Sequence, residues 1–295
     1  MQPLNTLPKY NMFGVEDIDY KKSKVVILPI PYDATVTYKS GTRDGPRAII
    51  EASRNMELYS YELGADISGL GFYTMDEMAP DLSSPENMAR RIAREVELIL
   101  SEGKLPLLLG GEHTLTIGAV QGVARKKKNF SVVQLDAHAD GRDEMFNSRY
   151  MHATVMARVG EIAKSSASVG IRSTHAKSQS KNTKTYFMGE VHSKGISAIA
   201  KDVAKHTEKE IYLTIDLDVL DPSEMPSVGT PEPDGLRFGE LCRFVEELAK
   251  SKKLIGLDIV ELSPIPQLHA PNYLAAKLAY LAVGYFIGSG KGSRA

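Results

Sequence analysis

The sequence lacks the features that mark a secreted protein or a partner of charged polymers. Its single cysteine, Cys242, cannot form a disulfide within the chain, which is typical of a reducing compartment such as the cytoplasm. The formal net charge is −1, so the charge balance does not favour nucleic acid or an anionic membrane as a partner. Internal repeats and low-complexity linkers are also missing from the sequence.

The sequence has no hydrophobic run long enough to cross a membrane. The longest run, 273–287, contains Lys277 and falls short of the roughly 20 residues that a span needs, so we expect a buried helix there. The N-terminal residues lack the basic start and apolar core of a secretory signal. We therefore expect a cytoplasmic protein with no membrane partner and no nucleic-acid partner.

The order of apolar runs indicates the fold class. Strand-like runs lie at 24–30, 105–109, 132–136, 167–171, 212–216 and 254–258, and helical patterns lie at 45–53, 87–101, 114–125, 238–248 and 273–287. Such alternation predicts an α/β fold of three layers, α/β/α, with a mainly parallel central sheet. We expect 1–295 to form a single domain, with 1–10 and 288–295 as flexible ends, because the candidate site residues are spread over most of the chain.

Two acidic segments directly follow strand-like runs. One reads Asp136-Ala-His138-Ala-Asp140, and the other contains Asp216-Leu-Asp218. Residues two apart on a strand share a face, so the side chains of each segment can converge if the extended geometry persists. Four converging carboxylates would resist ionisation unless a counter-charge is present. Divalent cations would supply that charge.

His113, in Gly110-Gly-Glu-His113, completes a candidate cage of two histidines and four aspartates. Two divalent cations would balance the four carboxylates, and oxygen ligands with some imidazole and no thiolate suit Mn²⁺. Paired metals can activate a water and polarise a hydrolysable bond. Either acidic segment alone is typical of a solvated strand end, but the three motifs together favour a metal site. The paired glycines are predicted to let the backbone turn tightly towards the site.

These motifs carry a resemblance to a known family. The chain resembles the ureohydrolases, the family of arginases and agmatinases, and it resembles agmatinases most. The matching segments are 31–38, 41–46, 110–114, 135–140, 169–172, 215–222, 229–233 and 256–264. The resemblance implies an arginase-like fold and two Mn²⁺ ions per chain. It also implies hydrolysis of a guanidino compound to urea and an amine, and a homo-oligomer, either a trimer or a hexamer.

The resemblance also assigns roles to the six candidate ligands. Asp136, Asp140 and Asp216 match residues that bridge or span the two metals in the family. The remaining three match residues that bind one metal each: His113, His138 and Asp218.

Three further residues match family positions at the substrate. His152 matches a proton shuttle, although Ala153 follows it where the family often has glycine. Glu261 matches the carboxylate that holds the guanidinium, which is chemically suitable because a carboxylate accepts two parallel N–H bonds from a planar cation. Thr230 matches a hydroxyl near the substrate.

Some residues depart from the family pattern or lie outside its motifs. Asp234 stands where glycine is usual, so we expect this loop to differ near the far end of the substrate. Asp221 is predicted to cap a turn together with Pro222. The basic segment 172–184 matches no amino-acid clamp of arginases, and its lysines would disfavour a diamine if they faced the pocket. Structural or surface roles are expected for His175, His192, His206 and His269.

The wording Gly-Thr-Pro-Glu-Pro at 229–233 resembles agmatinases more than arginases. We therefore predict a small-molecule substrate, agmatine, which would be cleaved to urea and putrescine. Arginine, 4-guanidinobutyrate and other guanidino compounds are alternatives. A more remote alternative is a metal-dependent deacylase of the same fold, which uses one catalytic metal. The last alternative is a vestigial site in a binding protein.

Overall fold

The computed structural model describes residues 9–15, 19–175 and 182–288. Eight strands form one sheet in the order β4-β1-β5-β10-β9-β6-β7-β8, and every neighbouring pair is parallel. The strands of this sheet are β1 (Val25–Ile30), β4 (Phe72–Thr74), β5 (Leu105–Gly110), β6 (Ser131–Leu135), β7 (Ser165–Ile171), β8 (Thr183–Phe187), β9 (Glu210–Asp216) and β10 (Lys253–Val260). A short antiparallel pair, β2 (Tyr59–Ser60) and β3 (Ala65–Asp66), lies apart from it.

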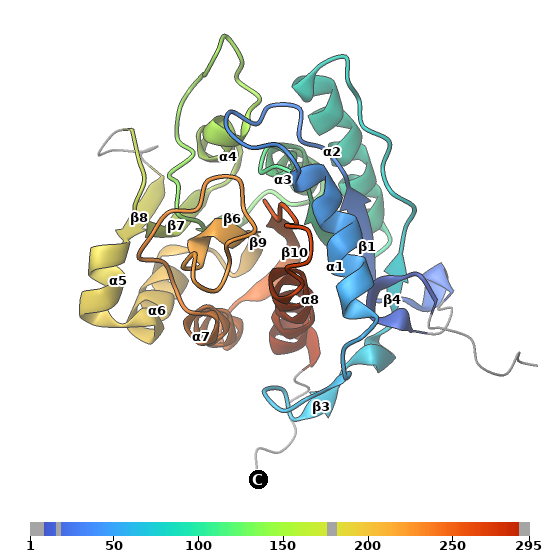
Figure 1. The fold of residues 1–295 in the computed structure, drawn as a ribbon. Helices are drawn as coiled ribbons and strands as arrows, with labels where there is room; N and C mark the ends of the chain where they lie inside the picture. Colours follow the sequence, from blue (N-terminus) through green and yellow to red (C-terminus); the bar gives the residue numbers. More distant parts are fainter. Residues whose placement is uncertain (1–8, 16–18, 176–181, 289–295) are drawn as a thin grey trace, which may run out of the picture.

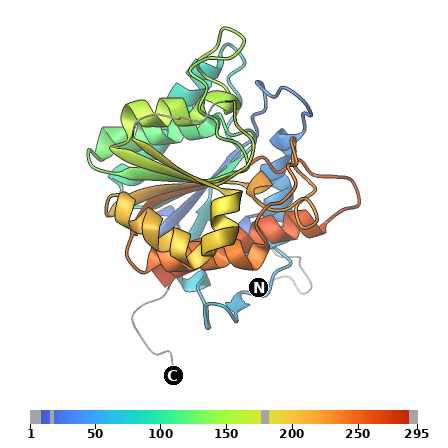
Figure 2. The same ribbon diagram turned by 90° about the vertical axis from the view of Figure 1, so that its left-hand side faces the viewer.

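Helices cover both faces of the sheet, as Figures 1 and 2 show. One face carries α2 (Pro85–Ser101), α3 (Leu115–Lys126) and α4 (Val155–Ile162). The other carries α1 (Gly45–Ser53), α5 (Met188–Lys194), α6 (Ile196–His206), α7 (Phe238–Ala249) and α8 (Ala270–Val283). The predicted three-layer α/β/α architecture is therefore confirmed.

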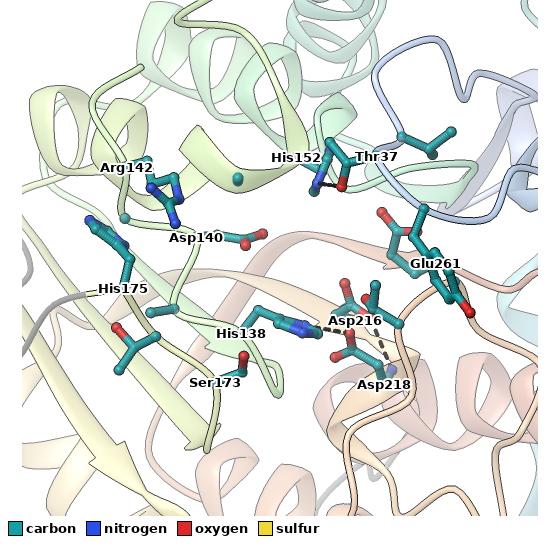
Figure 3. A pocket seen from close by; sticks show the side chains of 18 of the residues that line it. Thr37, His138, Asp140, Arg142, His152, Ser173, His175, Asp216, Asp218 and Glu261 are labelled. Atoms are coloured by element: carbon teal, nitrogen blue, oxygen red, sulfur yellow. Dashed lines mark hydrogen bonds and ion pairs between the residues drawn. The ribbon is translucent and has the colours of Figure 1, made fainter. Parts of the chain in front are cut away.

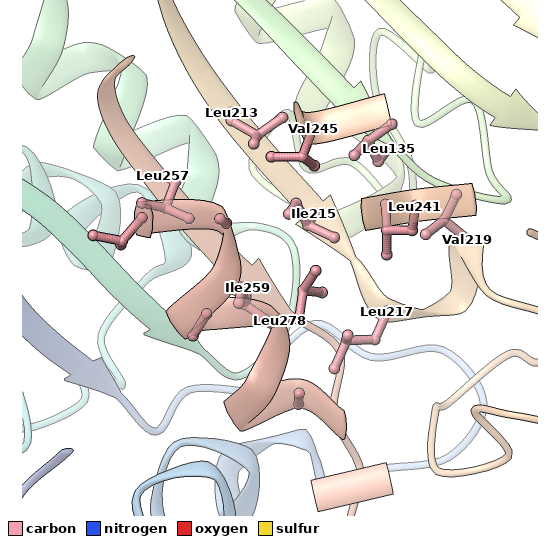
Figure 4. Packing of buried hydrophobic residues seen from close by; sticks show 14 of the residues in the cluster. Leu135, Leu213, Ile215, Leu217, Val219, Leu241, Val245, Leu257, Ile259 and Leu278 are labelled. Atoms are coloured by element: carbon pink, nitrogen blue, oxygen red, sulfur yellow. The ribbon is translucent and has the colours of Figure 1, made fainter. Parts of the chain in front are cut away.

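The central strands are almost continuously apolar because each of their faces packs against helices. Every residue of β5 and β6 is buried. Figure 4 shows the packing on one side of β9 and β10, where Leu213, Ile215, Leu257 and Ile259 meet residues of α7 and α8. Each side chain of this kind stabilises the fold by about 1.5–3 kcal/mol when it is fully buried. Strands β6 and β9, where the two acidic segments begin, are thus held in place by packing on both faces.

Element boundaries differ slightly from the predicted ones. The helix predicted at 87–101 begins two residues earlier, because Ser84 accepts a hydrogen bond from the backbone N–H of Asn87 and Pro85 takes the first helical position. The helix predicted at 273–287 begins at Ala270 and passes into a π turn at Gly284–Gly288. The predicted flexible ends lie largely outside the described residues.

Strand order determines where the site forms. The late strands β9 and β10 lie between β5 and β6, so the carboxyl ends of these four strands are neighbours in space. In open parallel sheets, ligands bind beyond these ends. Among the residues that the structure describes, no helix is both long and apolar enough to cross a membrane.

Candidate active site

The predicted site residues gather beyond the carboxyl ends of β5, β6, β9 and β10. His113 follows the last residue of β5 by three positions, and Asp136 directly follows β6. Asp216 is the last residue of β9, and Asp218 lies in the 3-10 turn Leu217–Val219 that comes next. Glu261 directly follows β10. Residues that are far apart in the sequence therefore share one small volume.

One cluster surrounds the ring of His113. Its Nδ1 lies 3.1 Å from Oδ2 of Asp140, 3.2 Å from Oδ2 of Asp136 and 3.4 Å from Oδ2 of Asp216. This nitrogen is buried and makes no hydrogen bond within the described residues. Ligands about 2.1 Å from a shared octahedral cation are about 3 Å from one another, so these separations fit a divalent ion between the four atoms.

A second cluster forms around His138. Its Nδ1 lies 2.7 Å from Oδ2 of Asp218 and 3.7 Å from Oδ1 of Asp136. Asp136 therefore directs one carboxylate oxygen to each histidine, which is the geometry expected of a ligand shared by two ions. His113, Asp136 and Asp140 form one potential metal-binding group, and Asp136, His138 and Asp218 form another.

The convergence does not come from extended strand geometry alone. Strand β6 ends at Leu135, and Asp140 adopts φ 44°, in the left-handed region that residues other than glycine rarely enter. Glu261 is also left-handed, with φ 68°. Backbone strain of this kind clusters at functional sites. In the turn between β5 and His113, a Cβ on Gly111 would lie 2.0 Å from the carbonyl oxygen of Tyr32. Close packing of the backbone therefore requires glycine at this position.

Burial and mutual repulsion dominate the electrostatics of the cluster. Burial, together with the charges of Asp218 and Asp140, raises the pKa of Asp136 to about 7. Burial and neighbouring carboxylates likewise raise the pKa of Asp216 well above its ordinary value. Burial opposes the charge on Asp218, but His138 holds the pKa of that carboxyl down, to about 2. The low exposure of the carboxylates excludes the alternative of solvated strand ends.

His152 begins a short 3-10 turn that continues into α4. Its Nε2 lies 3.4 Å from the hydroxyl of Thr37, and its buried Nδ1 has no hydrogen-bond partner among the described residues. Burial lowers the pKa of the imidazole, partly opposed by the charge of Asp140. Burial therefore favours the neutral form of His152, which can accept a proton and pass it on.

Glu261 lies on the other wall of the site. Its Oε1 accepts a hydrogen bond of 2.6 Å from the backbone N–H of His113, and its own N–H donates to the carbonyl of Gly111. Burial and the charge of Glu112 raise the pKa of Glu261 to about 8. An unpaired carboxylate in this position would be stabilised by a cation that enters the pocket.

These side chains line a pocket of about 290 Å³. Figure 3 shows His152 and Glu261 around the space above Asp216 and Asp218, with Arg142 and His175 on the opposite side. The predicted Thr230 also lines it, whereas Asp136 and His113 lie deeper. The sequence reasoning did not place His175 here. The available signal was its position four residues after Ile171, the end of a predicted strand.

Two charged residues that the sequence reasoning did not assign, the buried Glu112 and the partly buried Arg172, hold the loops around the pocket. Glu112 accepts hydrogen bonds from the backbone N–H and the hydroxyl of Thr35, at 2.8 and 2.7 Å. This anchors the loop that carries Thr37. The guanidinium of Arg172 donates to the carbonyls of Asp218, Glu232 and Pro233, at 2.7, 2.9 and 2.8 Å. Arg172 therefore ties the loop that carries Thr230 to the strand ends.

The loop around Asp234 differs from the expectation. Asp234 has φ 67°, a conformation that glycine adopts at no steric cost, and its side chain contacts His192 at 2.9 Å. It does not line the pocket in the part of the chain that the structure describes. The predicted turn cap is present, because Asp221 accepts from the backbone N–H groups of Ser223 and Gly235.

Of the other histidines, His206 contacts the carbonyl of Ser166, and His269 immediately precedes α8. In the basic segment, Lys184 forms an ion pair with Asp202 at 2.7 Å and so does not face the pocket. The other two lysines of that segment lie outside the described residues.

Comparison with known proteins decides the family. The family model described as "Arginase family" matches residues 23–284. The chain belongs to the arginase family. It is 36% identical to an N(1)-aminopropylagmatine ureohydrolase of Synechocystis over 95% of this chain and 94% of the relative. It is 34% identical to an agmatinase of Pyrococcus horikoshii over 93% of this chain and 97% of that relative.

A solved structure supports the same assignment. The agmatine ureohydrolase of Thermoplasma volcanium superposes with a TM-score of 0.81 at 31% identity, over 91% of this chain and 92% of that one. The predicted arginase-like fold and the prediction of an agmatinase-like ureohydrolase of the arginase family are confirmed.

Proposed function

We propose that this arginase-family enzyme cleaves the guanidino group of agmatine, or of an agmatine extended at its amine, to urea and an amine. The convergence of six potential ligands, the five residues of the two potential metal-binding groups and Asp216, beside a pocket with one further carboxylate is the observation that carries this proposal. The named relatives act on agmatine and on N(1)-aminopropylagmatine, which is why both are candidate substrates. In the first case the amine would be putrescine, as the sequence predicts.

Two Mn²⁺ ions fit the ligand set, since it offers oxygen and imidazole ligands, and the three separations around His113 Nδ1 suit a shared cation. His113, Asp136, Asp140 and Asp216 would hold one ion; of the three aspartates predicted to span both ions, only Asp136 also approaches His138 within the described residues. Asp136, His138 and Asp218 would hold the other. Bound there, the metals would supply an activated water and an electrophilic centre beside the substrate.

The residues of the chain would bind and orient the substrate. Glu261 would accept N–H bonds from the planar guanidinium and hold its carbon over the cluster. The neutral imidazole of His152 would take a proton and return it to the departing amine, which needs one to leave. Thr230 lies at the pocket wall and would contact the chain of the substrate.

One observation favours a second class of substrate. Arg142 and Lys39 line the pocket, and Arg142 forms no ion pair with another described residue. The carboxylates among the lining residues are Asp140, Asp216, Asp218 and Glu261, all at the metal end. A cationic wall at the far end would favour a guanidino acid over a diamine. Arginine and 4-guanidinobutyrate therefore belong in the same assay.

Urea release after Mn²⁺ loading tests the proposal. Agmatine, N(1)-aminopropylagmatine, arginine and 4-guanidinobutyrate should be compared at equal concentration, with a metal count on the same sample. Preference for one of the two amines supports the proposal, and preference for a guanidino acid overturns the substrate but keeps the reaction. Two metals per chain are expected; one would favour a deacylase, and none would favour a vestigial site.

We also propose that residues 1–295 form one cytoplasmic domain that assembles as a trimer or a hexamer. Light scattering of the purified chain tests the assembly, since a monomer would contradict it.

A further inference from the structure

The ring of His113 is backed by a row of buried hydroxyl groups that ends at a carboxylate. Its Nε2 lies 2.8 Å from Oγ1 of Thr214, which lies 3.3 Å from Oγ1 of Thr116. Thr116 donates a hydrogen bond of 2.8 Å to Oδ2 of Asp258, and the hydroxyl of Tyr212 donates to the same oxygen at 2.7 Å. All five side chains are 0% exposed.

Three structural elements meet in this row. Thr116 lies on α3, Tyr212 and Thr214 lie on β9, and Asp258 lies on β10. Water therefore cannot replace any member without a change in the packing of the sheet against α3. The hydroxyl row contacts one potential ligand, His113, and it does so only at Nε2, on the edge of the ring that points away from the carboxylates.

The direction of the hydrogen bonds in this row follows from proton counting. Oδ2 of Asp258 already accepts from two hydroxyls. Thr116 spends its only proton there, so its oxygen can only accept from Thr214. The oxygen of Thr214 is then left to accept a proton from His113. An imidazole that binds a metal through Nδ1 is neutral and has a single N–H, so in the metal-bound protein that proton lies on Nε2.

The consequence appears on the other side of the ring. With the proton on Nε2, the lone pair of Nδ1 points at the carboxylates of Asp136, Asp140 and Asp216. Lone pairs facing one another are unfavourable unless a cation lies between them. The opposite tautomer would place an N–H on Nδ1, which satisfies the carboxylates without a metal. The hydroxyl row therefore favours the tautomer whose Nδ1 can bind a metal over the tautomer whose Nδ1–H would compete with a metal for the carboxylates.

We propose that Thr214, Thr116 and Asp258 are positioning residues that hold His113 in the Nε2–H tautomer and so present Nδ1 for a metal. The inference rests on the proposed function, because it concerns the ligands of the proposed metal centre. The other histidine is less constrained. Nε2 of His138 lies 3.7 Å from Oε1 of Glu232, and its side chain is 24% exposed, so solvent can serve that nitrogen.

The test compares Thr214→Val with Thr214→Ser by equilibrium dialysis against Mn²⁺, with metal analysis of the protein. Valine keeps the shape but removes the acceptor, so one of the two Mn²⁺ ions should bind about 10–100-fold more weakly while the other is unchanged. Serine keeps the hydroxyl and should restore the affinity. Thermal unfolding of both metal-free variants verifies that they fold.

Wild-type stoichiometry and affinity in Thr214→Val would overturn the inference. Equal losses in the serine and valine variants would also overturn it, because packing of the methyl group would then be the cause. If Thr214→Val does not fold, Thr116→Val and Thr116→Ser make the same comparison one bond further from the metal. A wild-type protein that binds no Mn²⁺ would contradict the proposed function itself, which is a separate outcome.

Discussion

Replacement of Glu261 by glutamine isolates recognition of the guanidinium from metal binding. Glu261 is held at the end of β10 by its bond from the N–H of His113, and it does not belong to either potential metal-binding group. A glutamine oxygen could keep the bond to that N–H. The amide nitrogen would then present donors to the donors of the guanidinium, so the substrate would lose an acceptor without any change in side-chain size.

The size of the effect follows from the hydrogen bonds involved. A hydrogen bond to a charged group contributes about 1.5–3 kcal/mol, and the planar guanidinium offers two parallel donors to the carboxylate. A loss of about 3–4 kcal/mol corresponds to a fall in kcat/KM of roughly 10²–10³-fold, since about 1.4 kcal/mol changes an equilibrium tenfold. The Mn²⁺ content should stay at the wild-type value.

The substrate-free protein should respond in the opposite direction. Burial and Glu112 raise the pKa of Glu261 to about 8, so the carboxylate is unfavourable in the empty pocket. A neutral glutamine removes that cost, and the midpoint of thermal unfolding should be equal to or above that of the wild type. A residue that serves only the scaffold would lower it.

The assay measures urea against substrate concentration for wild type and variant, with metal analysis and thermal unfolding on the same preparations. Glu190→Gln is the control, because Glu190 forms an exposed ion pair with Lys194 on α5 and its loss should change stability by no more than about 1 kcal/mol. Full activity of Glu261→Gln would refute its assignment to the guanidinium. Loss of metal in this variant would show that Glu261 acts on the cluster instead.

Four further outcomes can be measured. Asp136→Asn should weaken both Mn²⁺ sites, because one carboxylate oxygen of Asp136 faces His113 and the other faces His138. His138→Ala should weaken only one site, and metal analysis distinguishes the two variants. His152→Asn should lower kcat by about 10²-fold with the metal content unchanged, in a steady-state assay. Arg172→Met should raise KM about tenfold through a loosened substrate loop, and unchanged KM would contradict this. Mn²⁺ should raise the unfolding midpoint more as the pH rises from about 4 to about 7. The reason is that the pKa of Asp136 is about 7 without metal, so ionisation of this buried carboxyl destabilises the metal-free fold as the pH rises.

The sequence predicted the central strands to within about two residues, because strands buried on both faces are necessarily runs of apolar residues. It also located the six potential ligands, since chemistry at the carboxyl ends of parallel strands follows such runs directly. The edge strands β4 and β8 were not predicted. The first has three residues, and the second, Thr183–Phe187, is mostly polar and only partly buried, so neither leaves a periodic signal.

The contacts that close the pocket were beyond local patterns. Thr35 and Glu112 are 77 residues apart in the sequence, and Arg172 reaches carbonyls about 46 to 61 residues away. Nothing near Glu112 in the sequence indicates that its carboxylate points to Thr35 and not to the potential metal ligands. The left-handed conformation of Asp140 was equally hidden, because an aspartate gives no local indication of a positive φ.

Different parts of the backbone carry the potential metal ligands and the side chains that would contact the rest of the substrate. The potential metal ligands lie on or next to rigid strand ends, whereas the side chains that would contact the rest of the substrate lie on two loops. Each loop is held by one charged side chain: the buried Glu112 accepts from the N–H and the hydroxyl of Thr35, and the partly buried Arg172 donates to backbone carbonyls. The side chains on these loops can therefore change without disturbance of the cluster. The charge of Glu112 also helps to raise the pKa of Glu261, so the residue that anchors the first loop acts electrostatically on the carboxylate at the pocket wall.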